Sequence, residues 1–356
     1  MNETNIVISQ NKNTITPKFE KNYIAVVFSS DDRFVYILSV ALKSLIDKTT
    51  SSWNYDICII SDGIQDSKKN LLQLICSNKE NVSLRFIEIS NLLDSTNLSV
   101  YNSHLSRTTF ARLYIPELFS EYSKVLSLDG DIIIKKDVAE LYNTNVDNFY
   151  FAAVPDAGLS LLYKFHKYDA YYLESIGINE KDKYFNAGVL LFNIVEFKNN
   201  YSVQRMIEMI AKNIFHFDEQ DAFNCFAKGH IKLLHFKWNL LYRVRIAEQN
   251  ILMSFTDYND AYNNPYIIHY AGGLLPTNIE NTLFATDFWN VARTTPCYES
   301  ILNIALNNYK KHAIEQKHKR LSKIIKIGKI FFSLLKKDGV IKTLRYCLYR
   351  SKDYSE

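Results

Sequence analysis

The segment Lys124–Ile134, KVLSLDGDIII, places two carboxylates directly after an apolar run. The apolar residues before Asp129 predict a buried strand. Asp129 and Asp131 are two residues apart, so on an extended chain both project from the same face. Gly130 between them lets a ligand approach the backbone closely. Paired carboxylates suit a hard divalent cation that also binds diphosphate oxygens, with helix capping and salt bridges as the alternative.

The segments around this strand alternate between strand and helix patterns. Short runs rich in β-branched residues are followed by stretches with helical periodicity. This alternation predicts an α/β fold with a mostly parallel sheet, in which ligands bind beyond the carboxyl ends of the strands. The expected strands are 23–28, 56–60, 84–89, 124–134, 149–154, 184–194, 231–236 and 266–270, and the expected helices are 35–46, 66–76, 109–119, 203–214 and one after residue 219.

The composition is that of a soluble globular protein. The 356 residues are 47% hydrophobic and 22% charged, which is enough chain to bury a core. Five scattered cysteines without C-x-x-C spacing indicate thiols in a reducing compartment. We find no signal peptide, no apolar run near the about 20 residues of a membrane span, and no P-loop, dinucleotide, zincin or hydrolase motif.

Charge is divided unevenly along the chain. Residues 310–356 hold 14 Lys and Arg against 4 Asp and Glu, whereas the rest holds 28 against 34. A basic amphipathic helix is expected within 319–337, either as an anchor on an anionic membrane surface or packed on its own domain. No nucleic-acid partner is expected, because the basic residues sit in one tail without a recognition motif. The predicted organisation is a polar lead over 1–22, a catalytic domain over 23–297 and a basic helical tail over 298–356.

A histidine follows a second apolar run, in Ile267-Ile268-His269-Tyr270, and Gly272-Gly273 come soon after. Imidazole together with carboxylates suits Mn²⁺ among the common metals, with Mg²⁺ as an alternative. Taken alone, this segment is better explained by a buried histidine that is hydrogen-bonded to the backbone.

Six ordered blocks between about Tyr23 and Thr277 resemble glycosyltransferase family 8. Within it the likeness is to bacterial lipopolysaccharide or lipooligosaccharide galactosyl- and glucosyltransferases. The blocks are FSSDD, HLSRTTFARLYIPELF, KVLSLDGDIIIKKDVAELY, YFNAGVLLFNI, EQDAFN and IIHYAGG. The resemblance implies a single nucleotide-diphospho-sugar transferase domain of the A type. It also implies retaining transfer of a hexose from UDP-galactose or UDP-glucose to a glycan acceptor, using Mn²⁺. The acceptor would be lipid-linked and the enzyme cytoplasmic, peripheral at the inner face of the cell membrane.

The resemblance also implies roles for individual residues. Asp129, Asp131 and His269 would be the metal ligands. Residues implied in donor binding are Asp31, Asp32, Arg112, Asp129, Gly130, Asn186, Ala187, Glu219 and Gly272. Residues implied around the reacting centre are Asp156, Gln220 and Asp221. Because an amide is a poor nucleophile, Gln220 favours attack by the acceptor from the face that UDP leaves, with Asp156 or Asp221 as nucleophile in the alternative.

Most of these blocks have a simpler structural explanation when taken one at a time. SSDDR could only cap a helix, and EQDAFN could only begin one. FARLYIPELF could be an amphipathic helix with Arg112 on its wet side.

The sequence departs from the family pattern at two places. Leu275 stands where the family commonly has a lysine that contacts the diphosphate, and Lys237, Arg243 or Arg245 would have to replace it. Glu219 stands where related enzymes often have Asp. Three alternatives stay open: a catalytically weak nucleotide-sugar-binding protein, a transferase acting on a glycoprotein, or one acting on itself.

Overall fold

A computed structural model describes most of the chain. The described residues are 5–7, 14–96, 98, 106–158, 172–179, 183–213, 215–242, 255–278, 282–315, 317–319, 322, 325–326 and 329. The chain forms two compact units. The first comprises Met1–Pro276 and Asn281–Ile301, and the second comprises Thr277–Glu280 and Leu302–Glu356.

The first unit is built on a mixed sheet that is mostly parallel. Among the described residues its eight strands lie in the order β1-β4-β3-β2-β5-β8-β7-β9. The neighbours from β1 to β5 pair in parallel, β8 runs antiparallel to both β5 and β7, and β9 pairs in parallel with β7. The bounds are β1 Asn5–Val7, β2 Tyr23–Asp31, β3 Asn54–Asp62, β4 Val82–Glu88, β5 Lys124–Leu128, β7 Phe151–Pro155, β8 Phe185–Asn193 and β9 Ile231–Leu233.

A second, two-stranded sheet joins two distant parts of the chain. β6 (Ile132–Ile134) pairs antiparallel with β10 (Ile267–His269), so that His269 lies opposite Ile132. This pairing brings the end of the Asp129–Asp131 segment beside His269.

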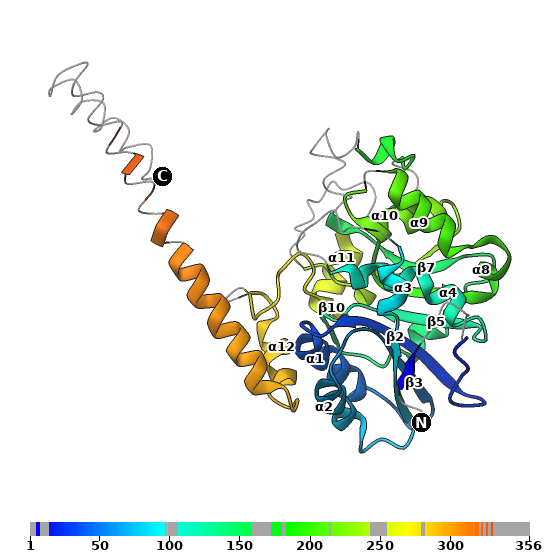
Figure 1. The fold of residues 1–356 in the computed structure, drawn as a ribbon, viewed down its shortest axis with the longest axis horizontal. Coiled ribbons are helices and arrows are strands. Elements are labelled where there is room, and N and C mark those ends of the chain that lie inside the picture. The colour runs from blue at the N-terminus through cyan, green and yellow to red at the C-terminus, as the bar shows by residue number, and fades with distance from the viewer. Residues whose placement is uncertain are drawn as a thin grey trace. The chain divides into compact units, whose positions relative to one another are not determined.

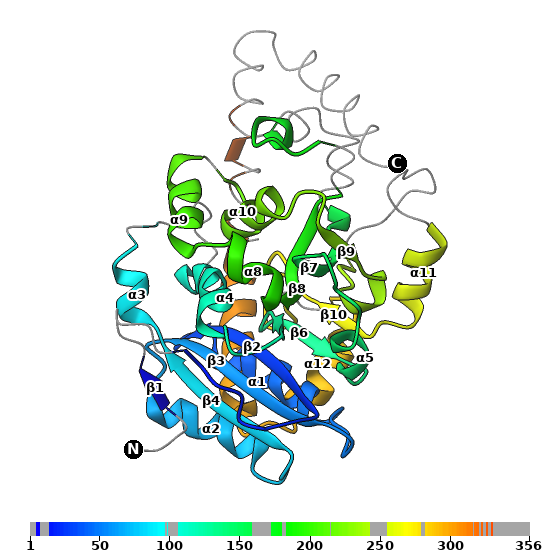
Figure 2. The same cartoon turned by 90° about the vertical axis from the view of Figure 1, so that its right-hand side faces the viewer.

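Helices cover both faces of the large sheet. α1, α2 and α12 lie on one face, and α4, α8 and α10 lie on the other (Figures 1 and 2). η1 packs against α4 and α10. The two faces follow from right-handed crossovers, because β2 to β4 step one way along the sheet and β5 returns the other way. The bounds are α1 Val35–Ile46, α2 Asp66–Cys76, α3 Ser90–Asp94, η1 Arg107–Tyr114, α4 Ile115–Leu118, α5 Ala139–Tyr142, α8 Ile194–Asn200, α9 Val203–Lys212, α10 Asp218–Phe226, η3 Phe236–Trp238, α11 Phe255–Asn263 and α12 Ala285–Ala292.

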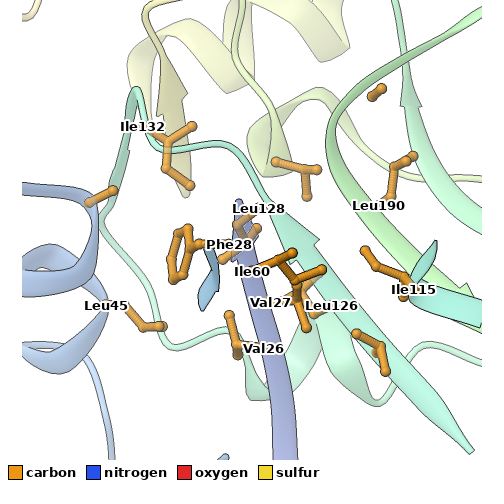
Figure 3. Close-up of a cluster of buried hydrophobic side chains, with 14 of the residues drawn as sticks. Val26, Val27, Phe28, Leu45, Ile60, Ile115, Leu126, Leu128, Ile132 and Leu190 are labelled. Atoms are coloured by element: carbon orange, nitrogen blue, oxygen red, sulfur yellow. The ribbon is translucent and has the colours of Figure 1, made fainter. Parts of the chain in front are cut away.

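The core sits between these layers. The central strand β2 is buried on both faces, as parallel strands covered on both sides must be. Figure 3 shows Phe28 toward Leu45 of α1, with Ile115 and Leu190 across the strand. The rigid sheet therefore fixes where each strand ends, and with it the residues that follow.

The α/β fold predicted from the alternation is confirmed, and two local predictions are wrong. Residues 124–134 form two strands in different sheets rather than one, since the chain turns at Gly130. Residues 107–118 form a 3₁₀ helix and a short α-helix rather than one helix, because Pro116 sits at the first turn of α4 and cannot continue a preceding ladder. The polar lead also contains a strand that the sequence analysis did not predict, the three-residue β1, which pairs with β4.

The predictions for the cysteines and for the C-terminal helix can be compared only with the described residues. Among them, Cys58, Cys76, Cys225 and Cys297 form no disulfide. The amphipathic helix expected within 319–337 lies almost entirely outside the described residues, as does Cys347. The predicted domain boundaries at 22 and 297 stay predictions.

Candidate active site

Acidic residues stand at the carboxyl ends of neighbouring parallel strands, and η1 is tied to three of them. This order follows from the sheet, in which β2, β3 and β5 present their carboxyl ends at one edge. Ser106 Oγ, next to η1, donates to Asp31 Oδ2 at 2.9 Å, Arg107 Nη2 donates to Asp62 Oδ1 at 2.7 Å, and Arg112 Nη1 donates to Asp129 Oδ1 at 2.8 Å. These charged contacts tie η1 to this edge of the sheet.

Asp129, Asp131 and His269 meet where the two sheets adjoin. His269 Nε2 lies 3.2 Å from Asp131 Oδ1 and 3.5 Å from Asp129 Oδ2. One ligand atom from each of the three residues falls within 4.8 Å of the others. The backbone holds them together, since Tyr270 N donates to the Asp131 carbonyl at 3.0 Å. Two carboxylates and an imidazole converging in this way fit a divalent cation such as Mn²⁺.

Burial and the neighbouring charges shift the pKa values of His269 and Asp131 in opposite directions. His269 is only 3% exposed. Burial alone would lower the pKa of His269, but Asp131 and Asp129 beside the ring raise it. Burial would raise the pKa of Asp131, but His269 lowers it. In the chain without a metal, the two carboxylates therefore favour the protonated form of His269 over the neutral form.

Two glycines are closely packed at the site, one against His269 and one against Phe34. A Cβ at Gly188 in β8 would lie 2.3 Å from His269 Cε1 and 2.7 Å from His269 Nδ1. A Cβ at Gly130 would lie 2.8 Å from Phe34 Cε1. Both distances are far below van der Waals contact, so glycine at these positions is a steric requirement of the site.

Arg112 is the hub of the site and does not point to water. Its side chain is 11% exposed and forms ion pairs with Asp129 and with Glu219. Nη1 also donates to the Ala187 carbonyl at 2.7 Å. The simpler alternative, an amphipathic helix with Arg112 on its wet side, is therefore excluded, while donor contact by Arg112 stays a prediction. Its guanidinium joins the metal-ligand segment to β8 and α10.

Glu219 is almost completely buried at the start of α10. Oε1 is paired with Arg112, while Oε2 has no hydrogen-bond partner among the described residues. Burial raises the pKa of Glu219 to about 7, against the opposing pull of Arg112. A buried carboxyl group with one unsatisfied oxygen is a place where a bound hydroxyl group can be recognised.

A network of amides and carboxyl groups lies next to this pair. Asp156 Oδ2 accepts from Asn186 Nδ2 at 3.0 Å and from Gln220 Nε2 at 3.4 Å. Gln220 Oε1 accepts from the Ala187 backbone N–H at 2.8 Å. The structure thus brings together Asp156, Asn186, Ala187 and Gln220 at the end of β8.

Asp221 lies beside this network but is enclosed. It is 0% exposed and accepts from the hydroxyl groups of Tyr172 and Tyr184 and from the Phe217 N–H. Burial raises the pKa of Asp221, while the two tyrosine hydroxyl groups oppose that rise. These three donors hold α10 against neighbouring segments, and the sequence alone gave no sign of the two tyrosines.

Asp31 and Asp32 hold the loop after β2. Asp31 Oδ1 accepts from the N–H groups of Arg33 and Phe34, so it caps the start of α1. Burial would raise the pKa of Asp31, but hydrogen bonds from Arg33 and Ser106 lower it overall. Asp32 accepts from Lys68 Nζ at 2.6 Å.

The segment after β10 is a turn without a cation of its own. Gly272 and Gly273 both have left-handed backbone, with φ of 69° and 80°. Leu275 is buried. Lys237 is committed to an ion pair with Asp260 at 2.6 Å. Arg243 and Arg245 lie outside the described residues.

The mostly parallel sheet, with an acidic pair, a histidine and a buried arginine at its carboxyl edge, has the A-type nucleotide-diphospho-sugar transferase fold of similar solved glycosyltransferases. The family model described as glycosyl transferase family 8 matches residues 25–276, and the chain belongs to this family.

Similar proteins agree with this assignment. General stress protein A of Bacillus subtilis is 24% identical over 265 residues, which are 71% of this chain and 87% of that protein. The bifunctional glycosyltransferase WbbM superposes with a TM-score of 0.71 at 26% identity, over 82% of this chain and 53% of that one. The galactosyltransferase LgtC, in complex with donor and acceptor sugar analogues, superposes with a TM-score of 0.65 at 22% identity, over 77% of this chain and 96% of LgtC. The last likeness shows the fold alone.

No helix among the described residues is long and apolar enough to traverse a bilayer.

Proposed function

We propose that this chain transfers a hexose from UDP-galactose or UDP-glucose to a glycan acceptor with retention of configuration at the anomeric carbon. The observation that carries this proposal is the convergence of Asp129, Asp131 and His269 beside Arg112, within a family 8 domain. Glycosyl transfer itself follows from the family, and the donor, metal and acceptor are the parts proposed here.

Asp129, Asp131 and His269 would hold Mn²⁺. A bound divalent cation would act as a Lewis acid on the diphosphate and stabilise the charge on departing UDP. Arg112 keeps Asp129 in place and offsets the charge of the acidic cluster. Asp31 and Asp32 would meet the uridine, in the loop that Ser106 and Lys68 fix.

We propose attack by the acceptor hydroxyl on the face from which UDP leaves. By its resemblance to the family, Gln220 would stand nearest the position of a nucleophile, but its Oε1 already accepts the Ala187 N–H. Asp221 is enclosed by two tyrosines, and Asp156 binds two amides. Asn186, Asp156 and Gln220 would instead orient the sugar, with Glu219 reading one of its hydroxyl groups.

We propose a lipopolysaccharide or lipooligosaccharide core as acceptor, reached from the inner face of the cell membrane. The sequence blocks resemble transferases of that kind, and the balance of +10 in residues 310–356 would attract anionic lipid. In the second unit, the helical residues 302–315 expose Leu302, Leu306 and Ile314 along with Lys310 and Lys311, which fits a surface helix.

The deciding experiment measures UDP release from UDP-galactose and from UDP-glucose, each with Mn²⁺ and with EDTA. Release from one donor that requires the metal is the expected result. UDP binding without release from either donor would instead favour the nucleotide-sugar-binding protein, which the buried Leu275 supports. A hexose mass increment on the chain itself would favour self-glycosylation.

A further inference from the structure

Asn239 lies beside His269 and was not among the residues expected from the sequence. It follows η3 and is 1% exposed. The next residue, Leu240, is tied to β10 in both directions: Leu240 N donates to the Ile267 carbonyl at 2.9 Å, and His269 N donates to the Leu240 carbonyl at 3.0 Å. The backbone therefore holds the Asn239 side chain against the imidazole.

The Asn239 amide joins His269 to the hydrogen-bond network at the end of β8. Its Oδ1 lies 2.9 Å from His269 Nδ1, and its Nδ2 donates to Asn186 Oδ1 at 2.8 Å. Asn186 extends this series of hydrogen bonds to two further residues. Its Oδ1 accepts the Gly188 N–H at 2.9 Å, and its Nδ2 donates to Asp156 at 3.0 Å.

The direction of each hydrogen bond in this series is set at the end that lies away from His269, by Gly188 and Asp156. The Gly188 backbone N–H can only donate, so it must face the oxygen of the Asn186 amide, and the Asp156 carboxylate then faces its nitrogen. Asn239 must in turn point its NH₂ at that oxygen. Its own oxygen is left facing His269 Nδ1, which must carry a proton to complete the bond. Turning the Asn186 amide over would set its NH₂ against the Gly188 N–H, and turning the Asn239 amide over would set its oxygen against the Asn186 oxygen, both in a buried place.

We propose that Asn239 is a positioning residue that fixes the tautomer of His269. With the proton held on Nδ1, the lone pair of Nε2 faces Asp129 and Asp131, where a cation would bind. The same amide couples this orientation to Asn186, which belongs to the hydrogen-bond network at the end of β8. The inference rests on the proposed metal-dependent transfer, and it assigns Asn239 an effect on both metal affinity and donor use. Hydrogen-bonded partners of this kind typically change metal affinity by about 10- to 100-fold.

Two variants separate the ends of this amide. Asn239→Leu removes both the acceptor for His269 and the donor to Asn186. Asn239→Asp keeps an acceptor for His269 Nδ1 and loses the donor to Asn186. Asn193→Leu is the matched control. Asn193, in β8, is also a buried asparagine, but it donates to the Val146 carbonyl.

The first readout is the imidazole ¹⁵N spectrum of the metal-free protein at alkaline pH, with the His269 signals assigned by their loss in His269→Gln. The wild type should show the proton on Nδ1, Asn239→Asp should keep it there, and Asn239→Leu should shift it toward Nε2. The second readout is Mn²⁺ binding alone, without donor. Asn239→Leu should bind about 10- to 100-fold more weakly, whereas Asn193→Leu should bind like the wild type.

A proton on Nε2 in the wild type or in Asn239→Asp would overturn the inference, as would unchanged Mn²⁺ affinity in a folded Asn239→Leu. If Asn239→Leu does not fold, the wild type and Asn239→Asp decide through their tautomers. Neither readout requires sugar transfer. A protein with the expected tautomers and affinities that releases no UDP would refute the proposed donors and leave the role of Asn239 intact.

Discussion

Replacing Gly188 by alanine tests whether the His269 ring truly packs on the β8 backbone. The added Cβ would lie 2.3 Å from His269 Cε1, 2.7 Å from His269 Nδ1 and 3.0 Å from Asn186 Oδ1. Alanine fits an ordinary strand, so the backbone itself does not oppose the change. The clash must therefore be relieved by moving the buried imidazole away from Asp129 and Asp131.

Two effects of known size follow from this displacement. Overpacking a well-packed interior costs typically about 1–3 kcal/mol of unfolding free energy. Disturbing the orientation of a metal ligand costs about 10- to 100-fold in metal affinity. We expect Gly188→Ala near the upper end of both ranges, because the nearest atom is part of a ring that is 3% exposed.

The assay is a double-mutant cycle in urea with His269→Ala, together with Mn²⁺ titration of each folded variant. If the ring is the obstacle, Gly188→Ala should cost much less stability when residue 269 is alanine. Gly229→Ala is the control: its φ is +79° and a Cβ there meets nothing within 4 Å, so it should lose stability through backbone strain and keep its Mn²⁺ affinity. Equal costs of Gly188→Ala in both backgrounds would refute the packing argument.

Three further predictions follow. Asp131→Asn should reduce UDP release on the order of 10³-fold, since the metal supplies several kcal/mol at about 1.4 kcal/mol per tenfold; Asp137→Asn, which alters a carboxylate bound by Tyr55, should leave release unchanged. The free energy of unfolding of the wild type, relative to that of Glu219→Gln, should fall by up to about 3 kcal/mol from pH 4.5 to about 7. The reason is that the raised pKa of Glu219 favours the protonated folded form at the acid end of that window. If urea titrations show the same difference between the two proteins across the window, the prediction is contradicted. Removing residues 310–356 should abolish sedimentation with anionic phospholipid vesicles and leave UDP release from the soluble donor unchanged, and vesicle binding by the shortened chain would exclude the tail as the membrane contact.

Periodicity and strand-end chemistry predicted much of the molecule. The alternating pattern gave the α/β fold, and the acidic pair after an apolar strand led to the Asp129–Asp131 segment. The burial of Arg112 could not be predicted, because its two acidic partners come from β5 and α10, which are far apart in the sequence. Asn239 was missed for a similar reason: an asparagine after an aromatic residue has no periodic signal, and its importance depends on the bridge between Leu240 and Ile268.

Residues 107–118 show where local pattern and tertiary structure disagree. Their apolar spacing fits an α-helix, yet Pro116 and the anchors of Ser106, Arg107 and Arg112 on three strand ends draw the segment into a 3₁₀ helix. The contacts across the sheet edge override the local preference.

The pairing of β6 with β10 has a consequence for synthesis of the chain. His269 lies 140 positions after Asp129, so two ligand residues leave the ribosome long before the third. Closing so long a loop is slow, and the finished site also needs Gly188 of β8 and Asn239, which lie against the histidine ring. A growing chain can therefore complete its sheet from β2 to β5 while still unable to hold the cation, and metal capture should report that the whole first unit has folded.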